Sequence, residues 1–248
     1  MEALKIRKEI LGDNHPDTAS SLNNLAVLYS KQGQYGKAEP LYIEALKIRR
    51  ETIGDNHPDT AANFNNLAML YYNQTQYGKA EPFFIDALKA QREILGDKHS
   101  GTATSLNNLA MLYFKQTQYG KAEPLFIEAL KIQRRIFGNK HQDTAITINN
   151  LAGLYSKQAQ NVEAEPLYLE ALGIFRNVLG KEHPEYALCL ANLAALYSDQ
   201  SEYSKAEPLY LEALKIRRKI LGDKHPDTAS TINNLGSLYF KQTQYSKT

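Results

Sequence analysis

"HPDTASSLNNLAVLY", residues 15–29, decides the fold, because it returns five more times along the chain with small changes. A fixed period is typical of proteins built by stacking one supersecondary unit on the next. We therefore interpret the chain as a repeat array rather than one or two ordinary globular domains. The histidines that open the copies stand 42 residues apart, at His15, His57, His99, His141, His183 and His225.

Each unit contains two helical patterns. Leu22, Leu25, Ala26 and Tyr29 fall at helical spacing, which predicts a first helix over about residues 17–32. The segment GQYGK, residues 33–37, breaks the pattern. A second apolar stripe then runs to Gly54, where a residue with positive φ would close a helix. Nothing in the unit reads as a strand, so the sequence predicts an all-α fold.

The second helix carries a proline and two small residues at fixed places. Pro40 and its copies are expected in the first turn, where the missing N–H has no intrahelical partner to lose. Ala38 and Ala45 are expected where the two helices cross. Such a hairpin has apolar surface on both sides, so it must stack on the next copy.

These residues carry a family resemblance. The pattern L-N-N-L-A-x-L-Y…Y-x-K-A-E-P-L-Y-x-E-A-L resembles a tetratricopeptide repeat, and the 42-residue spacing with G-D-x-H-P-D-T-A between units resembles the kinesin light chain type. The resemblance implies a right-handed α-solenoid of helix-turn-helix repeats, with a concave groove lined by the first helices. The sequence departs from the general pattern in two ways. No Trp opens the first helix, and Gly-Asp replaces the usual terminal proline.

The period divides residues 1–248 into one array of whole and partial units. We expect a half repeat over 1–14, full repeats over 15–56, 57–98, 99–140, 141–182 and 183–224, and a half repeat over 225–248. The two end helices lack their mates in this division. Exposed stacking faces are therefore expected at both ends, and head-to-tail self-association through the terminal helices is a predicted contact.

Asparagines dominate the side of the first helix opposite the apolar stripe, which in the resembled family lines the groove. An Asn side chain offers one acceptor and two donors, the complement of an extended peptide backbone. The same side chains could instead bond neighbouring helices and fix repeat orientation. Asn occupies two successive positions of the first helix, as at Asn23 and Asn24, and each position forms a column along the stacked repeats. The sequence leaves open which of these two columns is structural. The predicted peptide-binding asparagines are Asn23, Asn24, Asn65, Asn66, Asn107, Asn108, Asn149, Asn150, Asn192 and Asn234.

The other groove positions vary between copies, as specificity positions would. Lysines add positive charge, interrupted by Asp199, and Gly153 leaves room in mid-helix for a bulky ligand side chain. We expect a protein or peptide ligand with an apolar anchor and acidic flanks. The predicted contacts are the apolar residues Met69, Tyr72, Met111 and Phe114 and the basic residues Lys31, Lys115 and Lys157.

Composition and motifs argue against other classes of function. A formal net charge of +2 does not call for nucleic acid or an anionic membrane as partner, and no apolar run approaches the roughly 20 residues of a membrane span. The opening MEALKIRKEILG is no signal peptide. Cys189 is alone, which fits a reducing, cytoplasmic setting.

No catalytic residue, cofactor site or metal site is predicted. His15-Pro16-Asp17 reads as helix N-terminal chemistry rather than a cochaperone motif, and the histidine spacing does not match common zinc motifs. The basic runs KIRR at 47–50, KIQRR at 131–135 and KIRRK at 215–219 read as solvated helix faces, with nucleic acid a distant second. No phosphate loop, nucleophile elbow or carboxylate pair supports an enzyme.

Two functions follow from the sequence. The leading one is a protein–protein interaction scaffold that binds an extended peptide in the concave groove. The alternative is a structural, self-associating repeat spacer without a dedicated peptide ligand. Variation at the groove positions favours the scaffold, and the near-identity of the repeats elsewhere favours the spacer.

Overall fold

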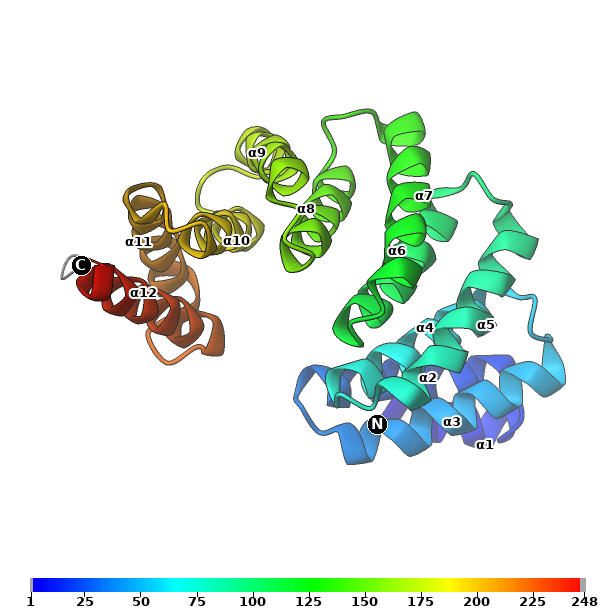
Figure 1. Ribbon diagram of the computed structural model, residues 1–248. Coiled ribbons are helices and arrows are strands. Elements are labelled where there is room, and N and C mark those ends of the chain that lie inside the picture. The colour runs from blue at the N-terminus through cyan, green and yellow to red at the C-terminus, as the bar shows by residue number, and fades with distance from the viewer. Residues whose placement is uncertain (1, 246–248) are drawn as a thin grey trace. The chain divides into compact units, whose positions relative to one another are not determined.

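A computed structural model describes residues 2–245 of the chain, as twelve helices without a strand (Figure 1). The predicted all-α repeat solenoid is confirmed. The extreme ends of the predicted half repeats, residue 1 and residues 246–248, lie outside the described part. The first helices of the repeats are α2 Pro16–Lys31, α4 Pro58–Asn73, α6 Ser100–Lys115, α8 Gln142–Lys157, α10 Pro184–Asp199 and α12 Pro226–Tyr245. The second helices are α1 Glu2–Leu11, α3 Tyr35–Thr52, α5 Tyr77–Leu95, α7 Tyr119–Phe137, α9 Asn161–Val178 and α11 Tyr203–Leu221.

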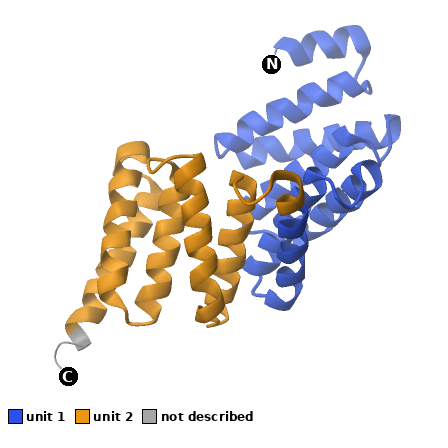
Figure 2. Ribbon diagram, turned by 90° about the horizontal axis from the view of Figure 1, so that it is seen from above, with its two compact units in different colours: residues 1–132 blue, residues 133–248 orange. Residues whose placement is uncertain are grey.

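The helices gather into two compact units (Figure 2). Unit 1 is Met1–Ile132 and unit 2 is Gln133–Thr248, so the division falls inside α7. In unit 1, α2 packs on α3 and α4 on α5, and each second helix then packs on the next first helix. In unit 2, the hairpins α8–α9 and α10–α11 follow the same order and end at α12.

A short loop closes each second helix and starts the next first helix. Gly12 has φ +88° and Gly54 has φ +81°, which an L-residue with a side chain adopts at a cost. The Thr18 hydroxyl donates to the Gly12 carbonyl oxygen at 2.8 Å, and Thr60 repeats this contact with Gly54 at 2.7 Å. These contacts explain why the loop sequence recurs.

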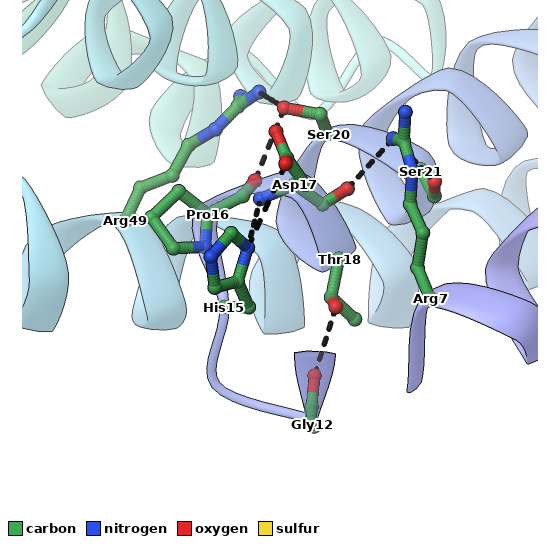
Figure 3. Close-up of polar contacts among 9 residues, drawn as sticks. All are labelled: Arg7, Gly12, His15, Pro16, Asp17, Thr18, Ser20, Ser21 and Arg49. Atoms are coloured by element: carbon green, nitrogen blue, oxygen red, sulfur yellow. Dashed lines mark hydrogen bonds and ion pairs between the residues drawn. The ribbon is translucent and has the colours of Figure 1, made fainter. Parts of the chain in front are cut away.

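The repeated histidine is the N-cap of the first helix, a role that the sequence pattern alone did not assign. The Asp17 backbone N–H donates to His15 Nδ1 at 3.1 Å, and Asp59 donates to His57 Nδ1 at 3.2 Å (Figure 3 shows the first of these). An N-cap side chain satisfies a backbone donor that otherwise lacks an intrahelical partner. The same contact forms at the N-termini of α6, α8, α10 and α12.

The predicted position of the second-helix proline is wrong. Helix α3 begins at Tyr35, so Pro40 lies in the second turn, inside the helix. The chain leaves the helical conformation only at residues 32–34, and the last three residues of GQYGK already belong to α3. Pro40 therefore leaves the Gly36 carbonyl without the N–H that another residue would have donated.

The turn between the two helices of a hairpin contains one left-handed residue. In the first repeat this residue is Gly33, with φ +71°. The same turn position holds Thr75 at φ +58° and Thr117 at φ +59°, although β-branched residues are disfavoured there. The repeats therefore differ in local backbone strain.

Small and large apolar residues share the core of each hairpin. Ala38 and Ala45 are fully buried, and Tyr42 beside them is 3% exposed. Leu22 and Ile48 bury against Ala19 and Ala45, with Leu4 and Leu41 packed around them. Burying one such large side chain contributes about 1.5–3 kcal/mol. Because Leu4 comes from α1, part of this core forms only when hairpins stack.

Candidate functional site

The predicted groove residues lie on the surface formed by the first helices, which we call the first-helix face. In unit 1 this face belongs to α2, α4 and α6. Met69, Tyr72, Met111 and Phe114 are all half-buried there. The ring centroids of Tyr72 and Phe84 lie 6.4 Å apart, and the two rings are nearly perpendicular. Phe84 of the same hairpin therefore supports the Tyr72 ring. The apolar part of the predicted site is thus present on two neighbouring first helices.

The two asparagine columns bond to each other between repeats. Asn66 Nδ2 donates to Asn23 Oδ1 at 3.1 Å, and Asn108 Nδ2 donates to Asn65 Oδ1 at 2.8 Å. Each pair spans 43 residues, so the second Asn of one repeat bonds to the first Asn of the repeat before it. In unit 2, Asn192 donates to Asn149 in the same way at 3.2 Å. Both columns therefore help to join hairpins.

The asparagines differ in how much solvent they reach. Asn23 and Asn149, which accept these bonds, are buried, whereas Asn24 and Asn234 are exposed. Asn234 stands where the preceding repeat has Ala191 in place of the first Asn, which removes its amide partner. The remaining predicted asparagines, Asn65, Asn66, Asn107, Asn108, Asn150 and Asn192, are half-buried.

The predicted basic residues lie at the C-terminal ends of the first helices. Lys31, Lys115 and Lys157 are exposed, and no acidic residue in the described part forms an ion pair with them. Lys241, at the same position of α12, pairs with Asp199 at 3.3 Å. The positive charge of this face therefore stays uncompensated at three first helices and is neutralised at a fourth.

The interpretation of the basic runs as solvated faces is wrong for Arg49, which is 4% exposed. Its Nη1 donates to the Asp59 carbonyl oxygen at 2.9 Å and to Asn63 Oδ1 at 3.3 Å. Its Nη2 donates to Ser20 Oγ at 3.3 Å (Figure 3). Burial lowers the pKa of Arg49, and the Asp59 carboxylate opposes that effect. Arg49 thus ties one hairpin to the first helix of the next.

The same correction applies to Arg217, which is 7% exposed. Arg217 donates to the Asp227 carbonyl oxygen at 2.9 Å and to Thr231 Oγ1 at 2.6 Å. Phe175 occupies the equivalent place before α10, and there the facing residue is the weakly polar Cys189. The sequence therefore did contain a signal, because the residue at this position and its facing partner change polarity together.

A second set of contacts joins the hairpins through tyrosines. The Tyr71 hydroxyl donates to Glu39 Oε1 at 2.8 Å, and Lys79 Nζ lies 5.3 Å from the Tyr71 ring centroid. Tyr113 repeats the contact with Glu81 at 3.0 Å. Burial and the hydrogen bond to the carboxylate raise the pKa of both tyrosines to about 12. These side chains remain neutral donors at physiological pH.

Two cavities on the surface of the second helices are repeat equivalents. One, of about 480 Å³, is lined by Leu4, Lys5, Lys8, Glu9, Asp13 and Leu25. The other, of about 410 Å³, is lined by the equivalent Leu46, Lys47, Arg50, Glu51 and Leu67, together with Ile43, Tyr71 and Phe83. Stacking thus produces the same hollow twice in unit 1.

Residues 2–245 contain no cluster of three or more His, Cys, Asp or Glu side chains arranged to hold a metal ion. None of the described helices is both long and apolar enough to cross a bilayer. Cys189 is a buried free thiol, and burial raises its pKa, so the thiol stays protonated.

Solved structures with the same architecture come from several proteins. BtubC (BKLC) from P. vanneervenii is 30% identical, with a TM-score of 0.72, covering 91% of this chain and 89% of that one. A kinesin-light-chain-like protein from Podospora anserina with nearly identical TPR-like repeats is 25% identical, with a TM-score of 0.70, covering 83% and 97%. The apo form of RapI shares the fold, with a TM-score of 0.70 at 17% identity over 92% and 85% of the two chains.

Family models agree with the structural comparison. No curated protein matches the chain. A model described as tetratricopeptide repeat matches residues 59–134, 101–176, 143–219 and 199–247. A second model with the same description matches residues 1–17 and 18–59. The chain therefore belongs to the tetratricopeptide repeat family, whose fold serves as a scaffold for protein–protein interaction.

Proposed function

We propose that the chain is a non-enzymatic scaffold that binds an extended peptide segment of a partner protein across its first-helix face. The observation that carries the proposal is the half-buried group Met69, Tyr72, Met111 and Phe114 on α4 and α6. Methionine and aromatic side chains on one surface make an adaptable apolar site. The proposal takes residues 1–248 as one array acting in the cytoplasm.

The polar residues around this group suit a peptide with acidic flanks. In unit 1, exposed Lys115 follows Phe114 directly and Lys31 lies at the equivalent end of α2, whereas Lys157, at the same end of α8, belongs to unit 2. In each Asn–Asn contact the second asparagine donates a side-chain N–H. The side-chain carbonyl oxygens of Asn66 and Asn108 accept no hydrogen bond from a described residue. Those oxygens can accept a peptide N–H.

A peptide-array screen with the whole chain tests the proposal. Phe114→Ala and Met111→Ser should weaken the selected peptides about tenfold while leaving the melting temperature close to wild type, because truncating a central aromatic anchor commonly costs more than 1 kcal/mol. Ile43→Ala on α3 is the matched control, since Ile43 is 48% exposed on the second-helix surface. Affinity should fall as salt rises. Selected peptides that bind Phe114→Ala as tightly as wild type would contradict the proposal.

Asparagine substitutions are a poor test of peptide binding. Asn66→Ala or Asn108→Ala would remove a bond between hairpins as well as a ligand contact. A loss of binding in those variants would not separate the two roles. The apolar residues separate them better, because their exposed parts contact solvent rather than another hairpin.

A second candidate function is self-association through the terminal helices, as in the structural repeat spacer that the sequence offers as an alternative. Ile6 of α1 is 47% exposed, whereas its equivalent Ile48 is 3% exposed. Ile232 of α12 is 40% exposed, whereas its equivalents Leu22 and Phe64 are each 1% exposed. A second copy that placed its α1 on α12 would bury the exposed apolar side chains of Ile6 and Ile232.

Light scattering across a concentration series tests this second candidate. The wild-type chain should associate as its concentration rises, and Ile6→Glu or Ile232→Glu should abolish the effect. Ile85→Glu on α5 is the control, since Ile85 is 44% exposed away from the terminal helices. A wild-type chain that stays monomeric at the highest concentration would exclude the candidate.

A further inference from the structure

The repeats differ in what the second helix presents beneath the first-helix face. Phe84 and Phe126 stand at one repeated position of the second helix, where other repeats have Tyr42, Tyr168 and Tyr210. The first helix of a hairpin varies in step. In the two hairpins with Phe, the first helix carries an aromatic residue, Tyr72 or Phe114. In the three hairpins with Tyr, it carries a serine, Ser30, Ser156 or Ser198. The second and third full repeats therefore share one pair of residue types, and the first, fourth and fifth share the other.

The hairpin α8–α9 combines the hydroxyl of a buried tyrosine with a missing side chain. Tyr168 is 3% exposed, and its hydroxyl makes no hydrogen bond to any described residue. A Cβ built on Gly153 would lie 3.4 Å from Tyr168 Oη and would meet no other atom within 4 Å. The equivalent residues are larger in the first three repeats, at Val27, Met69 and Met111. The gap at Gly153 thus leads to a polar group that lacks a partner.

The Tyr168 hydroxyl differs from its counterpart in the first repeat. Burial raises the pKa of Tyr42, and an interaction with Ser30, which occupies the place of Ser156, partly opposes that effect. Burial raises the pKa of Tyr168, so its hydroxyl keeps its proton and can donate. The Tyr168 hydroxyl oxygen keeps some contact with solvent, so a ligand acceptor can replace water there. Exposed Lys157 lies one helical turn beyond Gly153 and forms no ion pair with a described acidic residue.

We propose that the gap over Gly153 is a subsite for a carboxylate side chain of the bound peptide, which accepts a hydrogen bond from Tyr168 Oη and lies near the Lys157 ammonium. The inference rests on the proposed use of the first-helix face. A donor hydroxyl and a cation together favour a carboxylate over a neutral amide, since charge-assisted hydrogen bonds are about twice as strong as neutral ones. A ligand oxygen that enters slightly deeper than the Cβ position reaches hydrogen-bond distance.

Single amino-acid probes test the subsite without a long peptide. The chain has 14 glycines, so labelling with 15N-glycine gives few amide signals, and Gly153→Ala identifies the signal of Gly153. N-acetylglutamate N-methylamide is the acidic probe, and N-acetylglutamine N-methylamide is its neutral match. We expect the Gly153 signal to shift saturably with the acidic probe and to need at least tenfold more of the neutral one.

Variants assign the interaction to its atoms. Tyr168→Phe should weaken the acidic probe at least fivefold and erase most of the preference for acid. Phenylalanine already stands at the equivalent Phe84 and Phe126, so the hairpin tolerates the change. Lys157→Gln should reduce the preference and its salt dependence without changing the melting temperature. Tyr42→Phe is the control and should leave the Gly153 titration unchanged, because Tyr42 lies on α3, in another hairpin.

The outcomes separate this inference from the proposed function. Equal Gly153 shifts with both probes, or unchanged acid binding in Tyr168→Phe, would overturn the subsite. Array peptides that still depend on Phe114 would in that case leave the scaffold proposal intact. Conversely, acid binding that depends on Tyr168, together with array peptides indifferent to Phe114, would keep the subsite and refute the proposed apolar anchor.

Discussion

Relieving backbone strain in one hairpin turn should stabilise the whole chain. Thr75 has φ +58°, and the left-handed region costs a residue with a side chain about 1–2 kcal/mol. Glycine removes that cost but loses about 0.5–1 kcal/mol through its greater freedom in the unfolded chain. Thr75→Gly should therefore raise the free energy of unfolding by about 0.5–1 kcal/mol. The Thr75 side chain makes no hydrogen bond to a described residue, so little else is lost.

Thermal unfolding followed by far-ultraviolet circular dichroism measures the effect. For a chain of this length, 1 kcal/mol corresponds to about 2–4 °C, so we expect an increase of roughly 1–4 °C. Gly33→Thr imposes the strain on the first repeat, where φ is +71°, and should lower the melting temperature. Ala62→Gly, in the interior of α4, is the matched control and should destabilise by about 1 kcal/mol. A lower melting temperature in Thr75→Gly would refute the reasoning.

Three further predictions concern the contacts between hairpins. Asn66→Ala should lower the free energy of unfolding by about 1 kcal/mol in a urea titration, whereas exposed Asn24→Ala should change it by less than about 0.5 kcal/mol; equal effects would mean that the Asn66–Asn23 bond contributes nothing. Arg49→Ala should cost about 2–4 kcal/mol in the same titration, because it leaves Asn63 and the Asp59 carbonyl without their donor, and the neighbouring exposed Lys47→Ala should be nearly neutral. Stability should also fall in alkali: the folded-state pKa of about 12 for Tyr71 and Tyr113 lies above the value of about 10 for free tyrosine, so their contribution is complete below pH about 10 and is lost as the pH rises through about 12. Glu39→Gln should weaken the loss at Tyr71, and an unfolding free energy that stays constant from pH 9 to 12 would contradict the assignment.

Residues that act within one hairpin were predictable from the sequence. Leu22, Ala26 and Ala45 follow helical spacing, and their burial needs only the pairing of two neighbouring helices. Gly54 was expected to end the second helix, and its φ of +81° agrees. A period of 42 residues then extends these assignments to the other copies. The fold was predictable because each local sequence signal recurs in several repeats.

Residues that act between hairpins were harder to predict. Arg49 sits in a basic run, and a helical projection of one helix cannot show that the next first helix covers it. The Asn23–Asn66 bond joins different positions of successive repeats, so a comparison of equivalent positions alone does not reveal it. The capping role of His15 depends on its Nδ1 atom, which residue type alone does not specify. Contacts across the stack require the stacking register as well as the pattern of each helix.

The uniform register between neighbouring hairpins affects how the number of repeats in this protein can change during evolution. Removing residues 57–98 would leave Asn108 opposite Asn23 and Tyr113 opposite Glu39, which are the partners that Asn66 and Tyr71 now have. Arg49 would meet Ser105 in place of Asn63, and the equivalent Arg7 already donates to a serine hydroxyl, that of Ser21. Unequal recombination between copies can therefore delete or duplicate a whole module without creating an unfamiliar junction.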